Sequence, residues 1–229
     1  VPRALAERAT RQLGAAVCGA WGTTETCLGT LSAPEDEPAL VWGTDGRALA
    51  GVGIRVVDAA GAVLGPGREG NFEITSRCLF TGYLDRPDLT AEAMTADGWY
   101  RSGDLAVIEE SGFVRITGRV KDVINRGGEK VPVAEIEQLL HQHPAIREAA
   151  IVAMPDERLG ERACAYVVAS GDLDFAELQR FLDSRRVSIH YWPERLEFVT
   201  ALPRNPAGKV QKYLLREWIS ELRDGEVQR

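Results

Sequence analysis

Gly118-Arg-Val-Lys-Asp-Val-Ile-Asn-Arg-Gly-Gly-Glu-Lys-Val-Pro-Val-Ala-Glu-Ile-Glu137 is the stretch that decides the fold of the C-terminal half of the chain. Its pattern predicts a strand, then a turn at the glycine pair, then a helix that begins at Pro132. Gly127 and Gly128 can take positive φ at little steric cost, so the backbone can turn sharply there or approach a ligand closely. Taken alone, the stretch is equally typical of a surface hairpin followed by a helix.

Three further segments accompany this stretch. Trp21-Gly-Thr-Thr-Glu25 and Tyr100-Arg-Ser-Gly-Asp104-Leu105 precede it, and Pro203-Arg-Asn-Pro-Ala-Gly-Lys209-Val-Gln-Lys212 follows it. The first offers an aromatic face, a glycine, two hydroxyls and a carboxylate, which suit a base, phosphate oxygens and Mg²⁺. The last segment places Lys209 in a Gly/Pro loop. This loop is not a phosphate loop of the Gly-x-x-x-x-Gly-Lys-Ser/Thr kind, because Pro203 and Val210 break that pattern at both ends.

In this order the four segments resemble the adenylate-forming superfamily of acyl-CoA synthetases, aryl-acid ligases and nonribosomal adenylation domains. The resemblance runs over residues 15–220 and covers only the C-terminal part of that family's chain, since the Ser/Thr/Gly-rich phosphate loop expected upstream is absent from this sequence. It implies an α/β and α+β fold: the end of the large domain's sheet with an antiparallel β-subdomain, then a small mobile α+β domain. We expect the domains to be residues 1–119 and 120–229.

The resemblance implies a nucleotide site in the first domain, with Glu25 helping to hold Mg²⁺. Asp104 would accept hydrogen bonds from the ribose hydroxyls, and Arg119 would donate to the same sugar. From the residues alone, Asp104 could equally stabilise a turn, and Arg119 could form a surface ion pair of little energetic weight. The full set implied to bind ATP or AMP is Trp21, Gly22, Thr23, Thr24, Asp104 and Arg119.

The second domain carries the other implied roles. Lys209 would bridge the substrate carboxylate and the α-phosphate during adenylation, and Lys121 would be the hinge between an adenylate-forming and a thioester-forming pose. Gly127 and Gly128 would lie beside the pantetheine arm of coenzyme A. The family often has Thr where this chain has Asn205, and without the motif context Lys209 would be read as a solvated loop lysine.

These residues predict an ATP-dependent carboxylate–CoA ligase, an AMP-forming acid–thiol ligase. Its pattern is closest to ligases for short-chain, cyclic or aromatic acids, with a place in fatty acid metabolism. One alternative is an aryl-acid adenylating enzyme that loads a carrier protein. Another is that the isolated chain is a non-catalytic fragment, because the phosphate loop and most of the acyl pocket would lie upstream.

Composition narrows the function classes. The 229 residues carry a formal net charge of -7, and no stacking ladder of aromatics alternates with Lys and Arg, so nucleic-acid binding is not expected. No run approaches the roughly 20 apolar residues of a membrane span. The four cysteines lack a CxxC pair, which favours reduced thiols in a cytoplasmic protein.

Hydrophobic periodicity predicts the remaining elements. We expect a helix over 3–14, a buried strand over 15–19 with the Trp21–Glu25 motif at its end, antiparallel strands between 54 and 75, a helix over 87–94 and a hairpin over 104–117. The C-terminal part should contain helices over 133–142, 174–186 and 211–223. It should also contain strands over 147–154, 162–169 and 195–200, with residues 155–161 as a loop.

Overall fold

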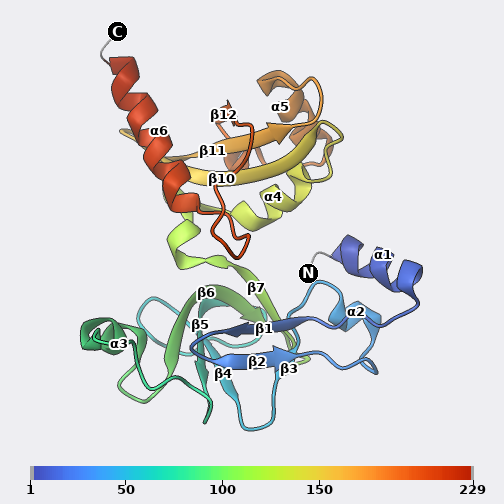
Figure 1. The fold of residues 1–229 in the computed structure, drawn as a ribbon, viewed down its shortest axis with the longest axis vertical. Coiled ribbons are helices and arrows are strands. Elements are labelled where there is room, and N and C mark those ends of the chain that lie inside the picture. Colours follow the sequence, from blue (N-terminus) through green and yellow to red (C-terminus); the bar gives the residue numbers. More distant parts are fainter. Residues whose placement is uncertain (1–2, 228–229) are drawn as a thin grey trace. The chain divides into compact units, whose positions relative to one another are not determined.

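The computed structural model of the protein describes residues 3–227. The chain divides into two compact units, residues 1–120 and 121–229 (Figure 1). We call them the N-terminal unit and the C-terminal unit.

The N-terminal unit is rich in antiparallel β-structure. One sheet has the strand order β1-β2-β3 and the other is the meander β4-β5-β6-β7. Its helices are α1 (Arg3–Leu13), α2 (Pro38–Val41) and α3 (Pro87–Ala93); its strands are β1 (Ala20–Thr23), β2 (Cys27–Leu31), β3 (Arg47–Ala48), β4 (Gly53–Val57), β5 (Glu69–Thr75), β6 (Tyr100–Ile108) and β7 (Val114–Arg119).

A buried cluster on the four-stranded sheet forms the core of this unit. Val56, Phe72, Ala106 and Val114 contribute one buried side chain from each strand, because alternate residues of a strand face the same side. Trp21 of β1 packs against this cluster, with its ring edge-on to Phe72 at a centroid distance of 4.9 Å. The Trp21–Glu25 motif is therefore attached to the core through its aromatic residue.

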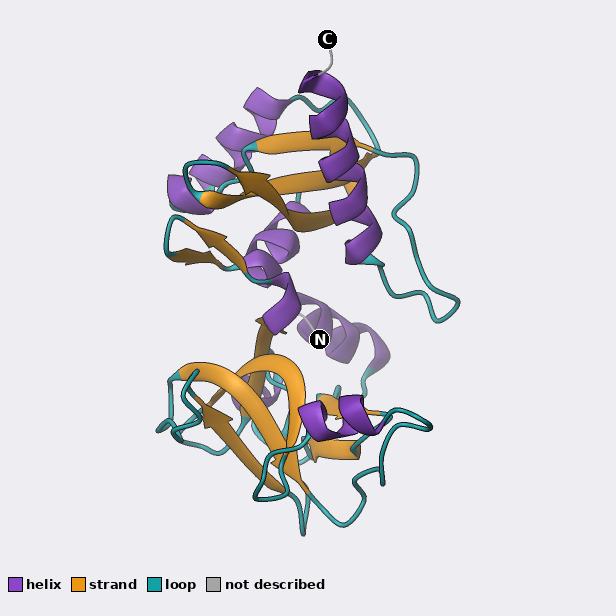
Figure 2. Cartoon of the chain, turned by 90° about the vertical axis from the view of Figure 1, so that its left-hand side faces the viewer, coloured by secondary structure: helices purple, strands orange, loops and turns teal. Residues whose placement is uncertain are grey.

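The C-terminal unit is a mixed sheet with helices on both faces (Figure 2). Its strand order is β10-β11-β8-β9, and β12 runs parallel to β11. Its strands are β8 (Ile124–Arg126), β9 (Glu129–Val131), β10 (Ile146–Asp156), β11 (Gly160–Ala169) and β12 (Arg195–Phe198); its helices are α4 (Val133–Leu140), α5 (Phe175–Ser184) and α6 (Lys212–Val227), with short 3₁₀ turns at Val120–Asp122 and Ile189–Tyr191.

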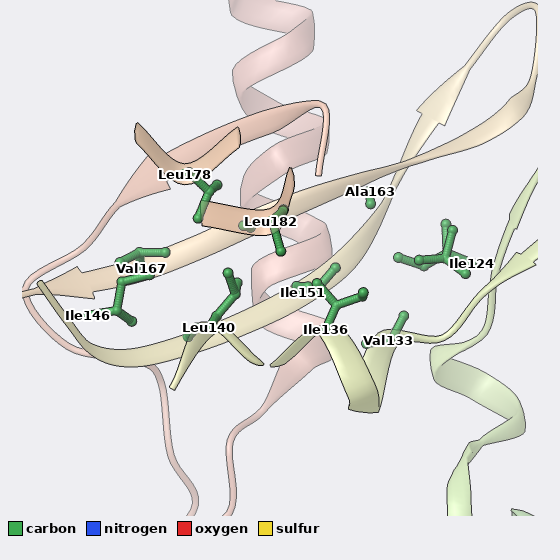
Figure 3. Close-up of a cluster of buried hydrophobic side chains, with 13 residues drawn as sticks. Ile124, Val133, Ile136, Leu140, Ile146, Ile151, Ala163, Val167, Leu178 and Leu182 are labelled. Atoms are coloured by element: carbon green, nitrogen blue, oxygen red, sulfur yellow. The ribbon is translucent and has the colours of Figure 1, made fainter. Parts of the chain in front are cut away.

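The two long strands β10 and β11 are buried on both faces. Figure 3 shows one face, where Ile151 and Val167 meet Leu140 of α4 and Leu182 of α5. The intervening residues of the same strands face α6 and pack on its buried Leu215 and Ile219. A strand buried on both sides reads as a continuous apolar run, as the sequence does here.

Two expectations for local structure were wrong. Residues 15–19 are not a strand, and β1 begins only at Ala20, because no described strand pairs with these residues. Residues 155–161 are not a loop, since Pro155 pairs with Glu161 inside the β10–β11 hairpin. Proline is tolerated there because β10 is an edge strand and its missing N–H would have no partner.

Candidate nucleotide and acyl-transfer site

Asp104 is the centre of the first cluster of candidate residues. Its side chain is buried, and its two carboxylate oxygens accept hydrogen bonds from the Trp21 indole Nε1, at 2.9 Å, and from Arg119 Nε, also at 2.9 Å. The register of β6 with β7 places Asp104 directly opposite Arg119. These two donors fix the direction of the Asp104 carboxylate.

The turn between β1 and β2 holds the rest of the Trp21–Glu25 motif. A side chain at Gly22 would collide with the Cys27 backbone carbonyl, so only glycine fits there. The Thr23 backbone N–H donates to the Thr26 hydroxyl at 3.0 Å, and Thr24 is exposed at the tip of the turn. The hydroxyl of Thr24 is therefore available to a ligand, whereas Thr23 also stabilises the turn.

Glu25 is held by aromatic neighbours. The Tyr83 hydroxyl donates to Glu25 Oε1 at 2.8 Å, and the rings of Tyr83 and Tyr100 both pack edge-on against Phe80. Burial alone raises the pKa of Glu25, but hydrogen bonds from Tyr83, from its own backbone N–H, from Thr23 and from Tyr100 outweigh it, so the pKa of Glu25 lies below its ordinary value. Glu25 is thus ionised at neutral pH.

An ionised, preoriented carboxylate fits a Mg²⁺ ligand. No cluster of three or more His, Cys, Asp or Glu side chains able to hold a metal occurs within residues 3–227. Magnesium at a nucleotide is usually held by one or two carboxylates together with phosphates and water. One carboxylate, such as Glu25, is therefore a sufficient protein ligand for Mg²⁺ at such a site.

Lys209 lies on the exposed loop before α6. The loop is closed by Asn205, whose side-chain Oδ1 accepts from the Lys209 N–H at 2.9 Å and whose own N–H donates to the Lys209 carbonyl at 2.9 Å. Arg204 fastens the loop to β10 by an ion pair with Glu148 at 2.7 Å. Within the described part of the chain no carboxylate pairs with the Lys209 ammonium, so its three donors are available to a ligand.

The glycine pair forms the two-residue turn of the β8–β9 hairpin. Gly127 and Gly128 have φ of +60° and +96°, as the tight hairpin turn with two positive φ values requires. The Gly128 N–H donates to Asn125 Oδ1 at 3.1 Å. An added Cβ at Gly128 would meet no atom within 4 Å, so this side of the turn is open to a ligand.

The predicted hinge, Lys121, lies in the short 3₁₀ turn Val120–Asp122. The next residue, Asp122, is tied to α6 by an ion pair with Arg216 at 3.0 Å. Four residues earlier on that helix, Lys212 pairs with Glu137 of α4 at 2.8 Å. The chain after Lys121 is therefore bound firmly into the C-terminal unit.

The structure brings Trp21, Asp104 and Arg119 into contact and places Glu25 in the adjoining turn. Lys121, Gly127, Gly128 and Lys209 all belong to the C-terminal unit. Sequence reasoning missed Tyr83 and Asn205 as residues that hold Glu25 and Lys209. Nothing in their spacing signals these roles, although Asn205 stands inside a recognised motif.

Comparison with known proteins agrees with the class that this fold and these clusters define. Residues 1–84 match the family model of the AMP-binding enzymes, and residues 135–209 match that of the AMP-binding enzyme C-terminal domain. Together the two matches cover more than two thirds of the chain. The chain belongs to the adenylate-forming superfamily of AMP-binding enzymes.

Individual relatives include both kinds of acid-activating enzyme. The chain is 43% identical over 220 residues to the medium-chain fatty-acid–CoA ligase of Escherichia coli K12, covering 95% of this chain and 39% of that protein. It is 41% identical over 179 residues to the salicyl-AMP ligase / salicyl-S-ArCP synthetase of Mycobacterium tuberculosis H37Rv, covering 77% of this chain and 32% of that protein.

Solved structures share the fold. The ATP-bound structure of MatB from Rhodopseudomonas palustris superposes with a TM-score of 0.89 at 33% identity, covering 96% of this chain and 44% of that chain. The chain spans between about a third and two fifths of the length of the curated relatives quoted above. No helix in the described residues is long and apolar enough to cross a membrane.

Proposed function

We propose that these residues belong to an ATP-dependent carboxylate–CoA ligase, whose intact form activates a small carboxylic acid as its adenylate and transfers the acyl group to coenzyme A. One observation carries the proposal: the same chain holds a carboxylate fixed by two donors, Asp104, and an exposed lysine on a closed loop, Lys209. Within residues 3–227 no carboxylate pairs with the Lys209 ammonium. Membership of the AMP-binding family supports the same chemistry.

In the first step, a carboxylate oxygen of the acid attacks the α-phosphorus of ATP and pyrophosphate leaves. Asp104 and Arg119 bind the ribose, and Trp21 and Thr24 border the base and the phosphates. Lys209 donates to the acid carboxylate and the α-phosphate, where negative charge must be stabilised during attack. Mg²⁺ bound at Glu25 would supply further neutralisation of the phosphate charge.

In the second step, the thiol of coenzyme A attacks the acyl carbon and AMP leaves. The reaction is thus split into two easier displacements through a mixed anhydride. The positive-φ turn at Gly127 and Gly128 offers side-chain-free backbone to the pantetheine arm. A change of backbone conformation at Lys121 would switch the enzyme from the adenylate-forming pose to the thioester-forming pose.

ATP–pyrophosphate exchange tests the first step. The acids should include medium-chain fatty acids, as the relative from Escherichia coli suggests, and short, cyclic and aromatic acids. The assay is run on the 229 residues and on a form extended by the upstream segment that the resemblance implies. We expect exchange only in the extended form, with loss on Lys209→Ala but not on Arg180→Ala, an exposed cation of α5.

Either of two results would contradict this account. No exchange with any acid in either form would exclude adenylation by this protein. Exchange by the 229 residues alone would show that the phosphate-binding part is not missing from them, which would also exclude the reading of the isolated chain as a non-catalytic fragment.

The second candidate is an aryl-acid adenylating enzyme that loads a carrier protein. The identity to a relative named as a salicyl-AMP ligase and salicyl-S-ArCP synthetase favours it specifically. The two candidates differ only in the acceptor thiol, so the preformed acyl-adenylate is offered to free coenzyme A or to a phosphopantetheinylated carrier protein. Faster acyl transfer to coenzyme A supports the ligase, and faster transfer to the carrier protein supports the alternative.

A further inference from the structure

The hairpin that carries Gly127 and Gly128 is weakly joined to its sheet by backbone contacts. Strands β8 and β9 have three residues each, and the register between β8 and β11 contains the single pair Gly160–Arg126. Ile124 anchors the base of the hairpin in the core, where Figure 3 shows it beside Val133. The turn itself lies at the far end from this anchor.

A guanidinium–carboxylate fork holds the hairpin near its turn. Arg126 Nε donates to Glu194 Oε2 at 3.1 Å, and its Nη2 donates to Glu194 Oε1 at 3.0 Å. The two side chains are 20% and 25% exposed. A bidentate pair of this kind fixes direction as well as distance, because the planar fork matches the carboxylate.

The fork spans a gap in the edge of the sheet. Strands β8 and β12 both pair with the edge of β11 that faces away from β10: Arg126 is opposite Gly160, and the N–H of Glu194 donates to the Ala163 carbonyl at 2.8 Å. Between these two points no described strand covers that edge. The Arg126–Glu194 pair therefore joins β8 to the start of β12 across the part of the β11 edge that lacks a paired strand.

Two backbone N–H groups of the hairpin make further hydrogen bonds. The Asn125 N–H donates to Glu161 Oε2 at 2.7 Å, and the Gly127 N–H donates to the Leu159 carbonyl at 2.8 Å. They tie the hairpin to Glu161 at the start of β11 and to Leu159 in the β10–β11 turn. Neither contact reaches β12, so within residues 3–227 the fork is the side-chain contact that connects the glycine turn to the segment leading into the parallel strand.

We propose that Arg126 and Glu194 are positioning residues that hold the Gly127–Gly128 turn in place for attack by the thiol, without a part in adenylation. The proposal rests on the function proposed above. Because attack requires the sulfur to pass close to the backbone, a turn displaced by about 1 Å is expected to slow acyl transfer by roughly a hundredfold. Adenylation does not use the turn and keeps its rate.

The test is Glu194→Gln in the extended, exchange-competent protein. Its matched control is Glu197→Gln. Glu197 lies in β12 and pairs with Arg195 at 2.6 Å. The side chains of Arg195 and Glu197 are 23% and 26% exposed, close to the values for Arg126 and Glu194. Three readouts are compared: ATP–pyrophosphate exchange, single-turnover transfer from the acyl-adenylate to the thiol, and amide hydrogen exchange of the peptide spanning 124–131. The exchanged pair Arg126→Glu/Glu194→Arg tests rescue.

We expect Glu194→Gln to keep pyrophosphate exchange within about twofold, to slow thiol transfer by about ten- to a hundredfold, and to speed hydrogen exchange in the hairpin. Glu197→Gln should change none of the three, and the exchanged pair should recover part of the transfer rate. Equal loss of both half-reactions in Glu194→Gln, or unchanged thiol transfer, overturns the proposal. A wild-type protein without pyrophosphate exchange instead overturns the proposed function, and hydrogen exchange in the hairpin still reports whether the fork holds it.

Discussion

The packing of α6 on the sheet of the C-terminal unit gives a sharp stability prediction. Leu215 and Ile219 of this helix are fully buried against β10 and β11. Leu215→Ala removes about three methylene equivalents, roughly 2.4 kcal/mol at about 0.8 kcal/mol each. The cavity that remains adds to this, so we expect a loss of about 3 kcal/mol in the free energy of unfolding.

Leu222→Ala is the matched control. It makes the same substitution on the same helix, so the change in helix propensity is equal. Leu222 is 43% exposed, and its truncation should cost about 1 kcal/mol or less. The difference between the two variants therefore isolates burial.

Urea titration with peptide-resolved hydrogen exchange is the appropriate assay, because a chain of two compact units need not unfold in one transition. A loss of 3 kcal/mol should speed exchange from the opened C-terminal unit by roughly a hundredfold. Peptides from β4–β7 should not change. Equal effects of the two substitutions, or a loss below about 1 kcal/mol for Leu215→Ala, would refute the packing of α6 on this face.

Three further outcomes follow from individual contacts. Hydrogen bonding to the Arg55 guanidinium lowers the pKa of Asp97 to about 2. The ionised Asp97 therefore stabilises the folded state above its ordinary pKa near 3.8, and this stabilisation is lost as the pH falls through about 2. In acid titrations, the difference in unfolding free energy between wild type and Asp97→Asn should vanish over that pH range. Tyr83→Phe should raise the pKa of Glu25, measured by carboxyl-carbon NMR, because the variant removes a donor to the ionised form, and an unchanged pKa would contradict the assigned hydrogen bond. Glu137→Ala removes both the ion pair to the lysine at the start of α6 and an acceptor for a backbone N–H of β10, and should cost about 2 kcal/mol in the urea titration; no loss would show that neither contact stabilises the fold.

Local patterns predicted most of the secondary structure. The glycine pair predicted a turn, and both residues have positive φ. The errors arose where strand pairing decides the outcome. Residues 15–19 have no described partner strand, and Pro155 is acceptable because β10 is at an edge.

In the candidate site, too, the sequence indicated the residue types, and the structure decided their contacts. The four motifs that contain Trp21, Asp104, Gly127 and Lys209, and their order along the chain, indicated an adenylate-forming enzyme, and the family is confirmed. That the Trp21 indole donates to Asp104 while its ring packs edge-on against the core was not predictable, because the contact joins residues 83 positions apart. Sequence reasoning had assigned Trp21 a stacking role toward adenine, which remains a proposal.

The sequence by itself determined the family, the order of the elements and the residues able to do chemistry, since these depend on side-chain type and on short-range periodicity. Only the tertiary structure decided which side chains hold them. The bonds from Tyr83 to Glu25 and from Arg126 to Glu194 join residues 58 and 68 positions apart. Such contacts form when the packing of separate strands brings distant residues together, and no local pattern in the sequence encodes that distance.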